Sequence, residues 1–238
     1  MLLNAVETGT GDKVAILLHG MTGSAESWWR IAPLLAGRGY RVLALDLPGH
    51  GLSARDPHLT IDIAAQALID TVEALAPGKS VTAVGHSYGG TVLAAAADRL
   101  PLSLAVYVDT TCAFESGEDR AALTAQYERD RERRMDADGL RESRPFYSET
   151  DARVEARAAE RFDPATSASI SCGADVAHAP GAGSILVRAD PSSFVSDTDA
   201  ERLTARGVDV RSIPGAAHTV WYSHFDEFCA TLPELFGT

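Results

Sequence analysis

The stretch "VGHSYGGT" (84–91) places one serine between two glycines, at the junction of an apolar run and a helix-like segment. Its core, "GHSYG", fits the pattern Gly-x-Ser-x-Gly, in which a tight strand-to-helix turn holds a serine hydroxyl clear of the backbone. The turn requires small residues two positions before and after the serine, and Gly85 and Gly89 meet that requirement. Amides and the dipole at the start of the helix favour developing negative charge. Ser87 is therefore the candidate nucleophile.

A serine nucleophile needs a base and an oriented imidazole. Among seven histidines, His218 lies in "IPGAAH", after the last apolar run and before a terminal helix-like stretch. It also completes the chain order serine, acid, histidine. His19 and His50 lie in "LHG" and "PGHG". In such turns, a histidine more often braces the backbone than acts as a base. The sequence therefore predicts His218 as the base.

Two carboxylates compete to orient that imidazole. Asp190 lies in "LVRADPSSFVSD", 28 residues before His218 (218 − 190), and Asp109 ends the apolar run in "VYVDTT". Either carboxylate would fix the tautomer of the ring and stabilise its charged form. We favour Asp190 and keep Asp109 as the alternative.

The elements that must position these residues are short apolar runs alternating with amphipathic stretches, the pattern of a mostly parallel sheet covered by helices. Buried parallel strands show such continuous apolar runs. In an open parallel sheet, function gathers at the carboxyl ends of the strands, where the candidate residues fall. The tail, 222–236, predicts one final covering helix. The predicted strands span 14–20, 40–51, 80–87, 104–111, 184–190 and 208–215.

The segment 112–183 breaks this alternation, since it contains no strand-like run. It holds charged helical pieces, "EDRAALTAQYERDRERRM" and "ETDARVEARAAERFD", and is far too long for a plain loop. The sequence predicts a separate helical subregion whose charges form a solvated face.

Composition excludes several classes of protein. A formal net charge of −12 argues against nucleic acid or an anionic membrane surface as partner. No apolar run approaches the ~20 residues of a membrane span, and the start does not read as a signal peptide, so a cytoplasmic location is expected. Motifs for dinucleotides, phosphates and metals are missing, so we predict no cofactor and no metal. Cys112, Cys172 and Cys229 are expected to be reduced and buried.

In this order, "LLHGMTGSAESW", "LALDLPGHGLS", "VGHSYGG" and "IPGAAHTVW" resemble the α/β-hydrolase superfamily. The resemblance covers residues 14–111 and 184–236. It implies an α/β fold with a hydrolase core over 1–111 and 184–238. It also implies a helical cap over 112–183, between that family's sixth and seventh strands.

The resemblance also bears on the site. It implies an oxyanion hole made by the backbone N–H groups of Met21 and Tyr88. The family's usual position for the acid falls here on Ser192, which cannot orient an imidazolium as a carboxylate does. Some members place the acid at the end of the sixth strand instead, where Asp109 lies.

These observations predict a cofactor-free serine hydrolase for a small, uncharged or apolar carboxylic ester, lactone or thioester. Trp28 and Trp221 are candidate walls of its pocket. One alternative is that the same residues serve carbon–carbon bond hydrolysis or a biosynthetic acyl transfer or cyclisation. Another is a non-catalytic ligand-binding protein on a hydrolase scaffold. The expected partner is a small-molecule substrate, and the oligomeric state stays open between monomer and homodimer.

Overall fold

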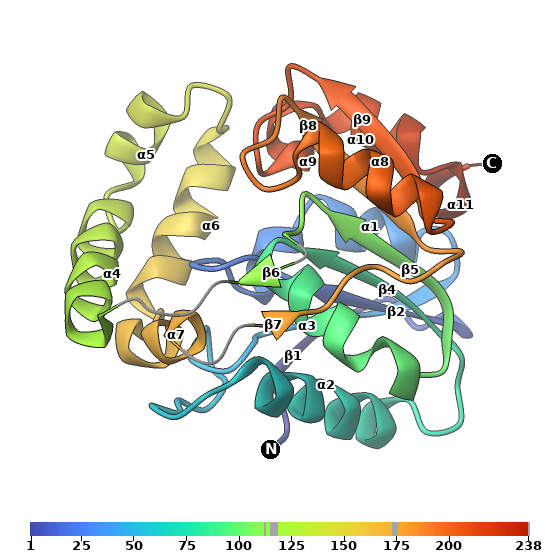
Figure 1. The fold of residues 1–238 in the computed structure, drawn as a ribbon, viewed down its shortest axis with the longest axis horizontal. Helices are drawn as coiled ribbons and strands as arrows, with labels where there is room; N and C mark the ends of the chain where they lie inside the picture. Colours follow the sequence, from blue (N-terminus) through green and yellow to red (C-terminus); the bar gives the residue numbers. More distant parts are fainter. Residues whose placement is uncertain (112, 115–118, 173–175, 238) are drawn as a thin grey trace.

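A seven-stranded sheet forms the centre of the molecule (Figure 1). The computed structural model describes residues 1–111, 113–114, 119–172 and 176–237. The strands lie in the order β1-β3-β2-β4-β5-β8-β9, and all neighbours run parallel except β1 with β3. Each of the six predicted runs forms one strand of this sheet, so the predicted α/β class is confirmed. The strands are β1 (Ala5–Thr8), β2 (Lys13–Leu18), β3 (Tyr40–Leu45), β4 (Val81–His86), β5 (Leu102–Val108), β8 (Ile185–Asp190) and β9 (Asp209–Pro214).

The edge strand β1 is the one member of this sheet that the sequence did not predict. It has four residues, "AVET", and none of them is fully buried. Because it lies at the edge and pairs only with β3, it lacks the continuous apolar run of a central strand.

Helices cover both faces of the sheet and build two apolar cores. Leu68, Leu93 and Leu203 anchor α2, α3 and α8 in one core. The other core contains Leu35 of α1 and the residues of the chain end. The helices of the two layers are η1 (Ala25–Trp28), α1 (Ile31–Ala36), α2 (Ile61–Leu75), α3 (Tyr88–Ala96), η2 (Ala97–Arg99), α8 (Asp197–Ala205), α9 (Val220–Ser223), α10 (Phe225–Thr231) and α11 (Pro233–Phe236).

The prediction of one terminal helix over 222–236 was wrong, because the structure divides this stretch among α9, α10 and α11. His224 and Leu232 leave the helical region, with φ of −137° and −121°. Pro233 then begins α11 at the first helical position, where its missing N–H costs nothing.

Four helices occupy most of the predicted subregion 112–183 and stand together beside the sheet (Figure 1). We call them the α4–α7 segment. Two strands of two residues each, β6 and β7, flank these helices and pair antiparallel, which the sequence did not predict. Residues 112, 115–118 and 173–175 of the predicted range lie outside the described residues. The elements are β6 (Ala113–Phe114), α4 (Arg120–Arg134), α5 (Ala137–Ser143), α6 (Glu149–Glu160), α7 (Pro164–Ser171) and β7 (Val176–Ala177).

Charge in the α4–α7 segment follows the prediction on one helix and departs from it on another. No residue of α4 is fully buried, as expected of a solvated face. On α6, however, Asp151 and Glu155 are buried. Asp151 accepts hydrogen bonds from Trp29 Nε1 (3.0 Å) and from Arg30 Nη2 (2.7 Å), which docks α6 onto the chain around η1. A buried carboxylate is retained because charged donors satisfy it.

Two further expectations concern cysteines and membranes. Cys172 and Cys229 are unpaired, but they are half-buried rather than buried, and Cys112 lies outside the described residues. Within the described ranges, no helix has the length and apolar character needed to cross a bilayer.

Candidate functional site

Ser87 occupies a tight turn between the last residue of β4 and the first residue of α3. Its backbone has φ +49° and ψ −120°, a strained conformation for any residue other than glycine. A Cβ added to Gly85 would lie 2.7 Å from the Gly89 carbonyl oxygen, and one added to Gly89 would lie 2.5 Å from the His19 carbonyl oxygen. The close packing of strand, turn and helix therefore explains why both flanking positions are glycine.

Backbone strain of this kind recurs around the site. Among the described non-glycine residues, positive φ occurs at Thr22 (70°), Ser87 (49°) and Asp109 (43°). Thr22 belongs to the turn after β2, Ser87 to the turn after β4, and Asp109 follows β5. These three strands are neighbours in the sheet. Residues in such conformations persist only where the surroundings hold them, and they cluster at functional sites.

Asp109 is the carboxylate that the structure places against His218. Its Oδ2 lies 2.7 Å from His218 Nδ1, and its side chain is 1% exposed. Because an ionised carboxylate only accepts hydrogen bonds, the proton of the neutral ring lies on Nδ1, and Nε2 carries the lone pair. Strand register places this acid beside the elbow, since Val108 of β5 pairs with His86 of β4.

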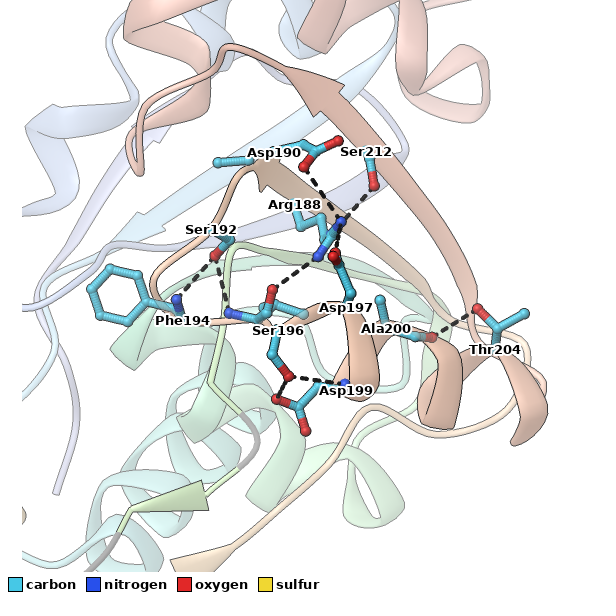
Figure 2. Close-up of polar contacts among 12 residues, drawn as sticks. Arg188, Asp190, Ser192, Phe194, Ser196, Asp197, Asp199, Ala200, Thr204 and Ser212 are labelled. Atoms are coloured by element: carbon cyan, nitrogen blue, oxygen red, sulfur yellow. Dashed lines mark hydrogen bonds and ion pairs between the residues drawn. The ribbon is translucent and has the colours of Figure 1, made fainter.

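Ser192 supports the same carboxylate from the other side. Its hydroxyl donates to Asp109 Oδ1 at 2.7 Å, and Ala189 N–H donates to the same oxygen at 3.1 Å. Figure 2 shows Ser192 Oγ in turn accepting from backbone N–H groups, including that of Phe194 at 3.0 Å. The position that the resemblance implies for the acid thus holds a serine that donates to Asp109.

Asp190, the acid that the sequence favours, does not contact His218. Its side chain is 42% exposed and lies 3.6 Å from Arg188 Nη2 (Figure 2). The same guanidinium contacts Asp197 at 2.5 Å. The preference for Asp190 followed from its spacing to His218 along the chain, and that spacing does not show that β8 ends at this residue or that its carboxylate lies beside Arg188.

Two aromatic rings fix the orientation of the His218 imidazole. The Phe194 ring stacks on it, with centroids 3.9 Å apart and planes inclined by 24°. The His86 ring lies 4.5 Å away, and its Nε2 donates to the His218 carbonyl oxygen at 3.0 Å. Burial, reinforced by His218 nearby, holds the pKa of His86 well below 6.5, so this ring is neutral. Sequence reasoning assigned no such role to Phe194 or His86, because only the fold brings them to His218.

The turn after β2 lies directly against the nucleophile. A Cβ built on Gly20 would lie 3.2 Å from Ser87 Cβ. The next residue is Met21, and its N–H donates to no other described residue. The same holds within these ranges for the N–H of Tyr88, the first residue of α3, where no intrahelical acceptor exists. Two uncommitted donors therefore flank Ser87.

His19 and His50 brace the backbone behind this turn, as expected. His19 Nδ1 lies 2.8 Å from the Gly20 carbonyl oxygen, and its Nε2 accepts from Leu47 N–H at 3.0 Å. His50 Nδ1 lies 2.9 Å from the Pro48 carbonyl oxygen. Burial lowers the pKa of both rings, and that of His50 falls to about 3.

A cavity of about 450 Å³ opens beside His218 and is lined also by Met21 and Trp221. Of the two tryptophans expected in the pocket wall, Trp28 instead lies behind Trp221, stacked on it at 4.3 Å and fully buried. The facing wall belongs to the α4–α7 segment. It includes Arg134, Arg144, Tyr147 and Glu155.

This facing wall contains a buried ion pair that the sequence did not reveal. Glu155 Oε2 accepts from Arg134 Nη2 at 3.0 Å. Ser27 Oγ and Tyr222 OH lie 2.8 and 3.0 Å from the other oxygen. Both charged residues belong to stretches rich in charge, where no local signal separates the inward-facing ones from the solvated ones.

Several curated proteins are similar in sequence to part of this chain. Norfluorocurarine synthase 1 of a Strychnos species is 35% identical over 104 residues, 42% of this chain and 39% of the relative. Methylesterase 8 of Arabidopsis thaliana is 38% identical over 98 residues, 40% of this chain and 36% of the relative. The matches thus span about two fifths of the length of these curated relatives.

One solved structure, the N-formylmaleamic acid deformylase of Pseudomonas putida S16, superposes with a TM-score of 0.77. The superposition covers 97% of this chain and 95% of that one, at 20% identity, which shows a shared fold. The model of the alpha/beta hydrolase family matches residues 15–231. This chain therefore belongs to the alpha/beta hydrolase family.

Proposed function

We propose that this protein is a serine hydrolase that cleaves a small carboxylic ester, lactone or thioester through Ser87, His218 and Asp109. One observation carries the proposal. His218 Nδ1 lies 2.7 Å from a buried carboxylate on β5, the strand next to the one that ends in the Ser87 elbow. A strained serine, an oriented imidazole and a buried acid at one sheet edge are the parts that acyl transfer requires.

In the first half of the reaction, Ser87 Oγ attacks the carbonyl carbon and transfers its proton to His218 Nε2. Asp109 keeps the Nδ1 proton in place and stabilises the imidazolium. His218 then returns the proton to the leaving alcohol or thiol as the carbon–oxygen or carbon–sulfur bond breaks. The acyl group stays on Ser87 until a water molecule, deprotonated by the same nitrogen, releases the acid and regenerates the serine.

The N–H groups of Met21 and Tyr88 would hold the oxyanion of each tetrahedral intermediate. Their lack of described acceptors and their position beside Ser87 support this role. Tyr88 N–H also lies at the start of α3, where the helix dipole favours negative charge.

The α4–α7 segment would serve as the cap of this site. It follows β5, precedes β8 and supplies one wall of the cavity that His218 lines. A helical wall over the site would exclude water during the reaction and select the substrate.

The names of the relatives support ester hydrolysis without excluding related chemistry. A methylesterase stands beside a synthase among them, so carbon–carbon cleavage, acyl transfer and cyclisation stay as alternatives for the same residues. A purely ligand-binding protein is disfavoured, because such a protein has no use for a buried carboxylate paired with His218.

The test is the hydrolysis of short-chain p-nitrophenyl esters by wild type and by Ser87→Ala. We expect kcat to fall by at least about a thousandfold, since loss of a triad nucleophile typically has such an effect. Undiminished turnover in the variant, with the same thermal unfolding curve as wild type, would contradict the proposal.

A further inference from the structure

Two arginines of the α4–α7 segment line the cavity that contains His218. Arg134 is the last residue of α4, and Arg144 directly follows α5. Both also line a second hollow of about 800 Å³, which shares Thr22 and Ser143 with the first. Both arginines therefore line the two adjoining hollows, and one small molecule in the first cavity can contact both an arginine and His218.

The charges along the first cavity do not cancel. Glu155 is matched by Arg134, its partner at 3.0 Å. Arg144 donates to Ser143 Oγ at 3.2 Å and lies 5.8 Å from the centre of the Tyr147 ring, yet no described carboxylate lies within ion-pair distance of it. The wall of the first cavity thus carries one unmatched positive charge. The adjoining hollow is also lined by Asp130, Glu132 and Asp136, of which Asp130 pairs with Arg133 and Asp136 accepts from the Asp138 N–H.

Arg134 adds a second unmatched group. Its Nε is buried and has no hydrogen-bond partner in the part of the chain that the structure describes. Buried donors in folded proteins are rarely left without an acceptor. Guanidinium N–H groups match the geometry of a carboxylate, so an anion beside Arg144 would satisfy both arginines.

The net negative charge of the whole chain contrasts with the positive charge on the wall of the first cavity. With a formal net charge of −12, the molecule repels small anions at long range. A cation at the inner cavity wall therefore gives no general attraction for anions and acts only over short distances, because salt screens the rest. This distribution suits selection of one anionic group on a bound molecule.

We infer that the substrate carries a carboxylate, held by Arg144 together with the Nε–H of Arg134, while its ester carbonyl lies at Ser87. The inference rests on the proposed hydrolysis and narrows its substrate class. It replaces the sequence-based expectation of an uncharged or apolar substrate, which treated the charges of this segment as solvated.

Monomethyl glutarate and dimethyl glutarate test this directly, with methanol release as the readout. Wild type should have the higher kcat/KM for the monomethyl ester. Arg144→Gln should lower the ratio of the two kcat/KM values by about tenfold or more, mainly through KM of the monoester, as loss of a charged hydrogen bond predicts. Arg141→Gln, an exposed arginine on α5, removes the same charge nearby and should keep the wild-type ratio. A ratio that Arg144→Gln leaves unchanged overturns the inference, as does wild-type preference for the diester.

Calorimetric binding of glutarate separates this inference from the proposed function. Wild type should bind glutarate, and Arg144→Gln should bind it at least about tenfold more weakly. If wild type cleaves neither these two esters nor the p-nitrophenyl esters, the hydrolase proposal fails, and glutarate binding alone decides the inference. If wild type cleaves the diester but glutarate binds equally to both proteins or to neither, carboxylate recognition is overturned and hydrolysis stands.

Discussion

Two regions face each other across the cavity, and they are built in different ways. At the carboxyl edge of the sheet, Ser87 and Asp109 are positioned by their own backbone, through strand register and positive φ. In the α4–α7 segment, Glu155 is positioned by side chains far away in sequence, such as Ser27. Backbone geometry thus sets the positions of the groups that we propose to react, whereas side-chain contacts between elements shape the wall that we propose as the selector of the substrate.

The largest effect is expected when each of the two carboxylates considered as the partner of His218 is replaced separately. Asp109→Asn should lower kcat by about ten-thousandfold, because an amide facing Nδ1 favours the wrong tautomer of the imidazole. Asp190→Asn should change kcat by less than about threefold, since that side chain is partly exposed and contacts Arg188. Steady-state hydrolysis of one ester by both variants measures this. A larger loss in Asp190→Asn than in Asp109→Asn would contradict the assignment.

The sheet edge can be predicted from the sequence better than the α4–α7 segment can. Ser87 and His218 are recognisable because a strand, a tight turn and a helix leave local patterns of glycine and apolar residues. Asp109 carries no such pattern, and the choice between it and Asp190 depends on which strand lies next to β4 and on where β8 ends. Spacing along the chain contains neither fact.

In the α4–α7 segment, even less of the arrangement of side chains can be predicted from the sequence. Its helices are evident from sequence, yet Glu155 and the neighbouring Arg153 look alike there, and only tertiary packing buries one and exposes the other. The strands β1, β6 and β7 were missed because each is short and lacks a continuous apolar run.

A second prediction tests whether side-chain contacts hold the wall. Glu155→Ala should lower the free energy of unfolding by about 3 to 5 kcal/mol, because it leaves Arg134 without its partner at a largely buried position. Glu149→Ala on the same helix is the control. Its side chain is 71% exposed and pairs with Arg153, so its loss should cost less than about 0.5 kcal/mol. Urea unfolding measures the free energy of unfolding of both variants. Equal losses would mean that the buried ion pair stabilises the fold no more than the exposed one.

A third prediction concerns how the free energy of unfolding depends on pH through histidines near the sheet edge. His19, His50 and His86 lie behind the sheet edge, and burial lowers the pKa of each below 6.5. As the pH falls below 6.5, the unfolded chain takes up protons on these rings and the folded chain does not, so the free energy of unfolding should decrease. The contribution is at most about 1.4 kcal/mol per pH unit for each histidine.

Urea unfolding of wild type and of His50→Gln, at pH 6.5 and at about pH 4.5, measures this slope. His50→Gln should have a shallower slope than wild type, since the folded-state pKa of His50 is about 3. His58→Gln, which alters an exposed histidine in a loop, should keep the wild-type slope. A slope that His50→Gln leaves unchanged would show that this ring is protonated in the folded protein.

We propose Ser87 as a nucleophile activated by His218 and Asp109, and the rate of its covalent labelling by a fluorophosphonate measures that activation. Mass spectrometry of the digested wild-type protein should place the adduct on Ser87. Labelling should be slowed by at least about a hundredfold in Asp109→Asn and left near the wild-type rate in Asp190→Asn. An adduct on another residue, or equal labelling rates in wild type and Asp109→Asn, would contradict the account.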